Sequence, residues 1–391
     1  MTIQVEALEL HEKNKGKIEI TSKVAIQNNE ELALAYTPGV AEPCKAIAQN
    51  KAEVYRYTAK GNLVAVVSDG SAVLGLGNIG AEAAMPVMEG KAVLFKQFAG
   101  IDAMPICLDT QAPAEIIQMV KVLAPTFGGI NLEDIASPQC FEIEKKLDEL
   151  LNIPVFHDDQ HGTAIVVAAA IINSLKLVRK KLSDVKIVVN GPGSAGTAII
   201  TMLLKMGAKK VLVCDEHGLL SVNRPEPLIG HKKKLAERTN LKNEVGTLSD
   251  ALAGADIFIG VSIGGILTSE LIAKMQTEPI VFAMANPEPE IMYDLAKSAG
   301  VRVMGTGRSD FPNQINNVLA FPGIFKGALS VRATTINDEM KFAAARAISD
   351  LVTFEELRED YIIPKIFDSR VAEQVASYVA EAAKQTKVNQ I

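Results

Sequence analysis

The sequence predicts a protein of the α/β class that is built from two domains. Its 391 residues are more than one ordinary hydrophobic core accommodates. From about residue 60 onward, short β-branched runs alternate with amphipathic helical patterns, which is typical of a mostly parallel sheet. Later, the apolar run VKIVV at 185–189 leads directly into the glycine-rich turn NGPGSAG at 190–196. We therefore expect an N-terminal, mostly parallel α/β domain and a C-terminal Rossmann-type dinucleotide-binding domain.

Strand and helix patterns place the elements of both domains. In the first half, strands are expected at 63–70, 102–109, 129–135 and 153–159, with helices at 84–100, 112–127 and 138–151. A long apolar helix is expected over 163–180, and the second half shows apolar strands at 185–189, 211–215, 256–262, 280–285 and 301–307. Helices at 335–352 and 370–384 close the chain. The domains are expected at 1–161 and 162–391, with the boundary beside Gly162.

Composition and charge are those of an ordinary folded protein of the cytoplasm. Apolar residues make up 48% of the chain, charged residues 22%, and the net charge is −6. An acidic chain is a poor partner for nucleic acid or an anionic membrane, so neither is expected to bind. The longest uncharged apolar segment, at 164–175, is too short to span a bilayer. The four cysteines lack CxxC spacing, so reduced thiols are expected.

The glycine-rich turn predicts a dinucleotide site. Gly191, Gly193 and Gly196 fit the pattern GxGxxG, and Ser194 and Ala195 open the helix that follows. The first glycine permits the tight turn, the second lets the backbone approach a pyrophosphate, and the third allows close helix packing. The helix N-terminus offers free N–H groups and a favourable dipole to the phosphates.

The strand after this helix predicts which dinucleotide binds. It ends at Asp215, about where an acidic side chain binds the ribose 2′-hydroxyl of NAD. Because Glu216 and His217 supply no arginine for a 2′-phosphate, NAD is favoured over NADP. The alternative is a structural turn followed by a surface aspartate.

Two pairs of acidic residues predict a metal site. Glu133 and Asp134 follow one expected strand, and Asp158 and Asp159 follow the next. Ligands of open α/β sheets collect at the carboxyl ends of strands, so the pairs are expected to converge. Carboxylates without cysteine favour Mg²⁺ or Mn²⁺.

Other interpretations of these segments stay open. His157 and His161 have the spacing of zinc ligands on a helix, but Gly162 and the preceding strand argue against a continuous helix through both. A hydrogen-bonded structural role is therefore favoured for each histidine. Glu133 and Asp134, taken alone, would equally fit an N-cap before the next helix.

Seven longer motifs resemble those of the malic enzymes, specifically the short bacterial form. They are AYTPGV (35–40), VSDGSAVLGLGNIG (67–80), MEGKAVLFKQFAGIDA (88–103), INLEDI (130–135), FHDDQHGTA (156–164), ANPEPEI (285–291) and NQINNVLAFPG (313–323). The resemblance covers essentially the whole chain. It implies oxidation of L-malate with NAD⁺, or with NADP⁺ as the alternative, and decarboxylation to pyruvate and CO₂ with Mg²⁺ or Mn²⁺. A homodimer that acts on a small-molecule substrate is also expected.

The resemblance implies roles for individual residues. It assigns the metal to Glu133, Asp134 and Asp159. Lys91 would be the general base that accepts the hydroxyl proton of malate, with Asp158 beside it. Lys91 must be neutral for this task, which partial burial or a nearby cation would favour by lowering its pKa.

The remaining implied roles concern proton donation and substrate binding. Tyr36 would be the general acid that protonates C3 after decarboxylation, and Asn286 and Asn317 would bind the substrate carboxylates. Without the resemblance, Tyr36 would be taken for a core residue at a helix end and Asn286 for a turn residue. Two departures stand out: Ala72 replaces an arginine that contacts malate in larger malic enzymes, and SIGGILT (262–268) lacks a proline often found there.

Two other functions fit the same residues. One is a metal-dependent dehydrogenase or decarboxylase of another 2-hydroxy or 2-oxo acid, such as oxaloacetate. The other is a module that binds NAD(H) without turnover. The presence of Lys91, Tyr36 and three metal carboxylates argues against the second.

Overall fold

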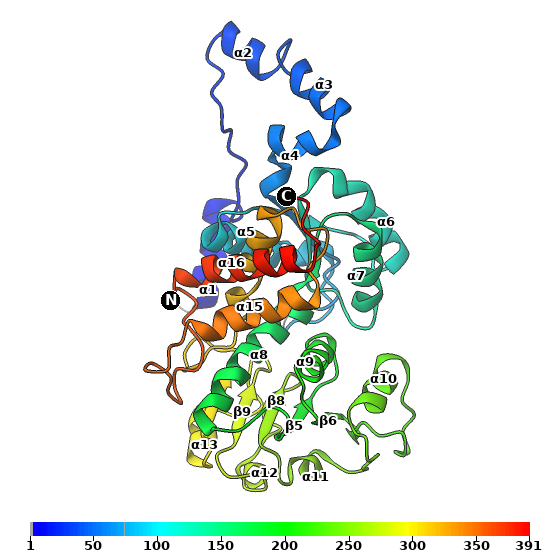
Figure 1. The fold of residues 1–391 in the computed structure, drawn as a ribbon, viewed down its shortest axis with the longest axis vertical. Helices are drawn as coiled ribbons and strands as arrows, with labels where there is room; N and C mark the ends of the chain where they lie inside the picture. Colours follow the sequence, from blue (N-terminus) through cyan, green and yellow to red (C-terminus); the bar gives the residue numbers. More distant parts are fainter. Residues whose placement is uncertain (1–2, 74) are drawn as a thin grey trace.

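Two sheets flanked by helices form the framework of the protein (Figure 1). The computed structural model describes residues 3–73 and 75–391, so Met1, Thr2 and Leu74, the last in the motif at 67–80, lie outside the described residues. The prediction of an α/β fold with a mostly parallel sheet and a Rossmann-type sheet is confirmed. The domain division at residue 161 stays a prediction.

The N-terminal segment is helical and mostly exposed. In Figure 1, α2 and α3 lie at one end of the molecule, beyond the rest of the fold. The elements before the first sheet are α1 (Ile3–Asn14), α2 (Asn29–Ala35), α3 (Ala41–Gln49), the 3₁₀ turn η1 (Lys51–Glu53), α4 (Val54–Tyr57) and η2 (Ala59–Asn62). None of α1 to α4 has a buried residue.

The first sheet is parallel, with strand order β2-β1-β3-β4. Successive residues of β1 face opposite sides, so Val64 and Val66 pack toward α5, whereas Ala65 and Val67 pack toward α6 and α7. The strands are β1 (Leu63–Ser68), β2 (Asp102–Cys107), β3 (Gly129–Leu132) and β4 (Val155–His157), and the helices are α5 (Ala81–Ala99), α6 (Pro113–Leu123), η3 (Ala124–Thr126) and α7 (Gln139–Leu150).

Helix α8 (Asp158–Val178) connects the two sheets and begins earlier than predicted. The sequence analysis placed its start after Gly162, but Gly162 lies within the first two turns. The helix is long and apolar enough to pass a test for a membrane span by length and composition, but 72% of its most apolar window is buried inside the protein. It packs against α9 and α15, so it is a core helix.

The second sheet has the order β10-β9-β8-β5-β6-β7, and its strands are parallel except for the β6–β7 pair. The order in which the chain adds strands reverses at β5, which lies between β8 and β6, and such a switch point is where these sheets bind ligands. Its strands are β5 (Lys186–Asn190), β6 (Lys210–Asp215), β7 (Gly218–Leu219), β8 (Ile257–Gly260), β9 (Ile280–Ala283) and β10 (Val303–Thr306). Its helices are α9 (Ser194–Lys205), α10 (Gly230–Arg238), α11 (Leu248–Leu252), α12 (Ser269–Ile272) and α13 (Tyr293–Ser298).

The C-terminal helices return to the first sheet. Phe321 and Phe325 on α14 meet Phe95 of α5 edge to face, with ring centroids 4.8 and 5.3 Å apart. These contacts belong to one large hydrophobic cluster that includes residues of both sheets. The closing elements are η4 (Asn317–Leu319), α14 (Phe321–Ser330), α15 (Asp338–Asp350) and α16 (Arg370–Gln385).

Candidate active site

The two acidic pairs meet at the carboxyl edge of the first sheet. Strands β3 and β4 are neighbours in parallel register, so Glu133 and Asp134 emerge beside Asp158 and Asp159. The backbone N–H of Asp134 donates to Asp159 Oδ2 at 2.8 Å, which ties the ends of the two strands together. The convergence expected from the sequence is therefore present in the fold.

This carboxylate cluster has the properties of a hard-cation site. Carboxylate oxygens of Glu133, Asp134 and Asp159 lie within 4.8 Å of one another. Asp134 Oδ2 and Asp158 Oδ1 are buried, and within the described ranges they have no hydrogen-bond partner. Burial raises the pKa of Glu133, Asp134 and Asp159, and the charges of neighbouring carboxylates add to this, although Lys91 opposes it. Oxygen donors that crowd and repel in this way fit Mg²⁺ or Mn²⁺.

The backbone of Asp134 is held in an unusual conformation. Its φ is +54°, in the left-handed region that residues other than glycine seldom adopt. Its carbonyl oxygen accepts a hydrogen bond from the backbone N–H of Ala72 at 2.9 Å. A strained backbone of this kind is retained where it directs a side chain to a functional position.

Lys91 lies among these carboxylates on the buried face of α5. Its Nζ is 2.6 Å from Asp158 Oδ2 and 2.8 Å from Glu133 Oε1, and it lies 4.1 Å above the centre of the Phe321 ring. Burial alone would lower the pKa of Lys91, but the two carboxylates outweigh it and raise the pKa above the usual range. This direction is opposite to the one expected from the sequence, which could not reveal that Lys91 contacts two acids at once.

Gly162 permits the close packing around Asp158. A Cβ on Gly162 would lie 1.9 Å from Asp158 Oδ1 and 3.1 Å from the Cβ of Asn317. Only glycine therefore fits here without displacing the buried carboxylate. The helix runs through Gly162 because tertiary packing overrides its low helix propensity. The same contact places Asn317, at the start of η4, beside the cluster.

The two histidines support the site through Glu144 of α7. His161 Nε2 lies 2.9 Å from the Glu144 carboxylate, and the backbone N–H of His157 donates to the same group at 3.0 Å. His157 precedes α8, so the two residues do not share a continuous helix. Burial alone would raise the pKa of Glu144, but the charge and hydrogen bond of His161 outweigh it and lower the pKa to about 2. Sequence reasoning missed Glu144, because only the fold brings it to the histidines.

Two residues that the sequence analysis assigned to the site lie apart from this cluster. Tyr36 ends α2 and is 65% exposed. Asn286 is exposed and follows β9, with its Nδ2 3.5 Å from the Met284 carbonyl. Pro287, next to it, lies 4.0 Å from the position of a Cβ on Gly75, so this loop faces the one that follows β1.

Buried Glu290 fixes the loop that carries Asn286. Its carboxylate accepts hydrogen bonds from the backbone N–H groups of Ala285 at 3.0 Å and Ser262 at 3.1 Å. It thereby joins the loops after β8 and β9, and nothing in the spacing of the sequence distinguished it from a surface acid.

The glycine turn after β5 has the geometry of a dinucleotide site. Gly191 has a φ of +106°, and a Cβ on Gly196 would lie 1.9 Å from the Gly191 carbonyl oxygen. Gly193 is the N-cap of α9, and Ser194 and Ala195 form its first turn. The free N–H groups of this helix end therefore stand at the carboxyl edge of the second sheet.

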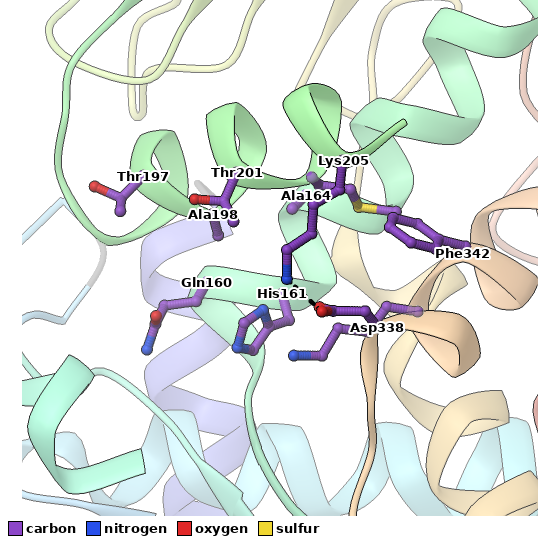
Figure 2. Close-up of a pocket in the computed structure, with 11 residues that line it drawn as sticks. Gln160, His161, Ala164, Thr197, Ala198, Thr201, Lys205, Asp338 and Phe342 are labelled. Carbon is purple, nitrogen blue, oxygen red and sulfur yellow. Dashed lines mark hydrogen bonds and ion pairs between the residues drawn. The ribbon is translucent and has the colours of Figure 1, made fainter. Parts of the chain in front are cut away.

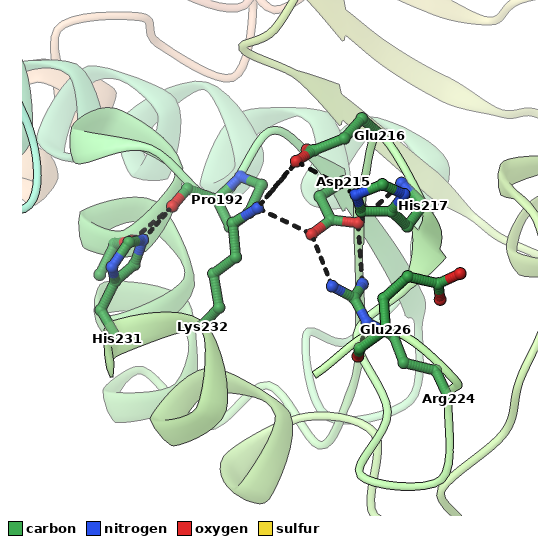
Figure 3. A network of polar contacts seen from close by, with 9 residues as sticks. Pro192, Asp215, Glu216, His217, Arg224, Glu226, His231 and Lys232 are labelled. Atoms are coloured by element: carbon green, nitrogen blue, oxygen red, sulfur yellow. Dashed lines mark hydrogen bonds and ion pairs between the residues drawn. The ribbon is translucent and has the colours of Figure 1, made fainter. Parts of the chain in front are cut away.

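Asp215 is held by two cations that the sequence analysis did not find (Figure 3). Arg224 binds its carboxylate through two hydrogen bonds of 2.8 and 3.1 Å, and Lys232 adds one of 2.8 Å. Burial alone would raise the pKa of Asp215, but the hydrogen bonds from Arg224 and Lys232 outweigh it and lower the pKa to about 2. Basic groups do reach this position, from a loop and from α10, so the absence of an arginine next to Asp215 in the sequence is not evidence against NADP.

A cavity of about 110 Å³ lies between α8, which follows the first sheet, and α9, which follows the glycine turn (Figure 2). Gln160 and His161 from the first turns of α8 line it, together with Thr197 and Thr201 from α9. The helix that carries Asp158 and the helix that follows the glycine turn thus pack side by side around a small open space.

A dinucleotide turn on one sheet and a lysine–carboxylate cluster on the other define an oxidoreductase of the two-domain α/β class. Residues 15–115 and 110–148 match the N-terminal domain of malic enzyme, and residues 160–384 match its NAD binding domain. The chain belongs to the malic enzyme family.

Individual relatives agree with this assignment over nearly all of this chain. The chain is 58% identical over 391 residues to the bifunctional malic/malolactic enzyme of Bacillus subtilis, covering 100% of this chain and 95% of that protein. It is 58% identical over 374 residues to the NAD-dependent malic enzyme of Geobacillus stearothermophilus, covering 95% and 78%. The crystal structure of malic enzyme from Pyrococcus horikoshii superposes with a TM-score of 0.95 at 51% identity, covering 100% of this chain and 92% of that one.

Proposed function

We propose that this chain converts L-malate and NAD⁺ into pyruvate, CO₂ and NADH, with NADP⁺ as the alternative oxidant. The observation that carries the proposal is the buried Lys91, which contacts Asp158 and Glu133 at the sheet edge where three carboxylates converge. Membership of the malic enzyme family supports it. We further propose a homodimer in the cytoplasm.

Glu133, Asp134 and Asp159 would hold Mg²⁺ or Mn²⁺. When bound, the cation supplies positive charge that stabilises the enolate left by decarboxylation. Glu133 forms an ion pair with Lys91 and would also bind the cation. The ion pair between Lys91 and Glu133 would therefore weaken when the cation binds. Loss of part of this ion pair would remove one of the contacts that raise the pKa of Lys91 and would favour its neutral form.

The protein side chains would carry the two proton transfers. Neutral Lys91 accepts the hydroxyl proton of malate while the C2 hydride passes to the nicotinamide, and Asp158 holds the Lys91 side-chain nitrogen in place before and after the transfer. Tyr36 donates a proton to C3 once CO₂ has left. Asn317, beside Gly162, and Asn286, on the facing loop, would hydrogen-bond the substrate carboxylates.

The test is malate turnover, followed as NADH or NADPH formation, with Mn²⁺ and with a chelator. We expect pyruvate and reduced nucleotide in equal amounts, loss of both with chelator, and recovery on adding Mn²⁺. A turnover rate that is unchanged by the chelator would overturn the metal assignment. Decarboxylation of oxaloacetate without any nucleotide-dependent oxidation of malate would favour a decarboxylase instead.

A second candidate is the direct conversion of malate to lactate. It is favoured by the 58% identity to a protein named a bifunctional malic/malolactic enzyme. Lactate formed from malate without accumulation of free NADH would support it, and pyruvate as the sole product would exclude it.

A further inference from the structure

A second cavity, of about 310 Å³, lies beside the amino ends of strands β5 and β6 in the second sheet. It is bounded by Lys186 at the start of β5, by residues 209–212 at the start of β6, and by the loop after α10. The glycine turn and Asp215 lie at the carboxyl ends of the same strands, about 17 Å away over the length of β6. This second cavity is therefore separate from the dinucleotide site.

Lysine side chains give this cavity a strong positive charge. Four lysines and one glutamate are among the residues that line it, so the lining carries a net charge of +3 on a chain whose overall charge is −6. We call this space the basic cavity; its charged residues are Lys186, Lys209, Lys210, Lys242 and Glu244. In the part of the chain that the structure describes, none of the four ammonium groups lies within 4.0 Å of a carboxylate oxygen. Neighbouring cations without a counter-charge repel one another, so an anion bound among them is stabilised.

Hydrogen bonds hold two of the lysines and the loop in place before any ligand binds. The Nζ groups of Lys186 and Lys210 donate to backbone carbonyls at 2.8 and 3.0 Å. The loop that carries Lys242 is fixed by Asn240, whose side chain is buried and donates to two backbone carbonyls at 3.2 and 2.7 Å. Its Oδ1 accepts from the Glu244 backbone N–H at 3.0 Å. A ligand therefore does not have to order the loop, which preserves its affinity.

The kinds of side chain in the lining favour phosphate over other anions. A lysine ammonium is a point charge that suits phosphate oxygens, whereas arginine, which pairs with carboxylates through two parallel bonds, is absent among the described lining residues. An aromatic side chain on which a nucleobase could stack is absent there too. We propose that the basic cavity binds a compact anion with two adjacent phosphate groups, a diphosphate. The proposal does not rest on the proposed function, because no step of malate turnover uses this cavity.

Calorimetry with inorganic pyrophosphate tests this site. The full chain is first saturated with NAD⁺ so that the glycine turn is occupied, and no metal is added because pyrophosphate itself binds divalent cations. We expect one pyrophosphate to bind per chain, with an affinity that falls as added NaCl screens the lysines. If pyrophosphate does not bind, or if NAD⁺ displaces it completely, the proposal is overturned.

Substitution of single lysines locates the bound pyrophosphate. Lys209→Gln and Lys242→Gln should each weaken its binding about tenfold, because one charge about 4 Å from two phosphate groups is worth that factor even in water. Both variants should keep their affinity for NAD⁺, which checks that they are folded. Lys233→Gln and Lys234→Gln, at exposed positions of α10 outside the lining, are the matched controls and should bind pyrophosphate as the unsubstituted chain does. Equal weakening in both pairs would show a general attraction to surface charge and would refute the site.

Two further anions show what the basic cavity recognises. ADP carries a diphosphate on a nucleoside, and with NAD⁺ still present it should bind no more tightly than pyrophosphate. Tighter binding of ADP would mean that the nucleoside is recognised as well, which would overturn the assignment of a compact ligand. Citrate, a compact tricarboxylate, should bind more weakly than pyrophosphate. Equal affinity for citrate would mean that the cavity selects charge alone, and the assignment of phosphate would then be wrong.

Discussion

Replacement of Gly162 by alanine should disrupt the site through a single methyl group. The added Cβ would lie 1.9 Å from Asp158 Oδ1, whereas an ordinary contact is at least 3.4 Å, so the carboxylate must retreat by about 1.5 Å. Asp158 is completely buried and its Oδ2 lies 2.6 Å from Lys91. A retreat of that size breaks the ion pair, which costs about 3–5 kcal/mol for a buried pair.

The gain in helix propensity does not offset this loss. Alanine is favoured over glycine within a helix by about 1 kcal/mol, so the net loss of stability should be about 2–4 kcal/mol. Misplacement of Asp158 by more than 1 Å should also lower kcat by about 10²-fold. Urea unfolding and malate turnover measure the two effects, and nucleotide binding should survive because the glycine turn belongs to the other sheet.

Gly90→Ala is the matched control for Gly162→Ala. Gly90 also lies within a helix and precedes Lys91, but its added Cβ would meet only the end of the Lys17 side chain, with Nζ at 3.7 Å and Cε at 3.9 Å. It should therefore stabilise the protein by about 0.5–1 kcal/mol. If Gly162→Ala were as stable and active as Gly90→Ala, the close packing around Asp158 would not constrain the site, and the reasoning would be wrong.

Three further substitutions test other parts of the structure. Asp159→Asn should sharply weaken Mn²⁺ binding by calorimetry and leave NAD⁺ binding intact; unchanged Mn²⁺ affinity would exclude Asp159 as a ligand. Asp215→Ser should free Arg224 and Lys232 for a 2′-phosphate and raise the NADP⁺/NAD⁺ ratio of kcat/KM about tenfold, and an unchanged ratio would refute this role. Lys60→Met should lower stability in urea unfolding by about 2–4 kcal/mol because three carbonyls lose their donor; a change below 1 kcal/mol would show that water replaces it.

Periodicity and turn chemistry were sufficient to predict the framework of the fold. The predicted helix at 138–151 is α7 (Gln139–Leu150), and the one at 370–384 is α16 (Arg370–Gln385). The acidic pairs were found because parallel strands end at one edge, a rule that needs no knowledge of packing. The predicted start of α8 was wrong because glycine disfavours helices on average. Here the close contact with Asp158 requires a glycine at position 162 within the helix.

The contacts that the sequence could not predict join residues distant along the chain. Arg224 and Lys232 reach Asp215 from a loop and from α10, and neither fits a recognised spacing. The pKa of Lys91 was expected to be lowered by partial burial or a nearby cation, but two carboxylates from separate strand ends reverse the direction. Tyr36 was assigned from a motif, which specifies a residue but not its position in the fold, and the structure places it at the exposed end of α2.

The position of Lys91 shows how the fold tolerates so much buried charge. Four buried or partly buried carboxylates surround a single lysine. This arrangement lowers the stability of the fold, because desolvation of each ion costs several kcal/mol. The charges lie directly on an aromatic layer: the Phe321 ring, which contacts Lys91 Nζ, packs on Phe95, and Phe325 packs on both Phe95 and Phe156. These rings come from α5, β4 and α14, so the return of the C-terminal helices to the first sheet supplies the rigid hydrophobic support that the site requires. The charge cluster is then best explained by function rather than by stability, since apolar residues of similar volume would stabilise the same position more.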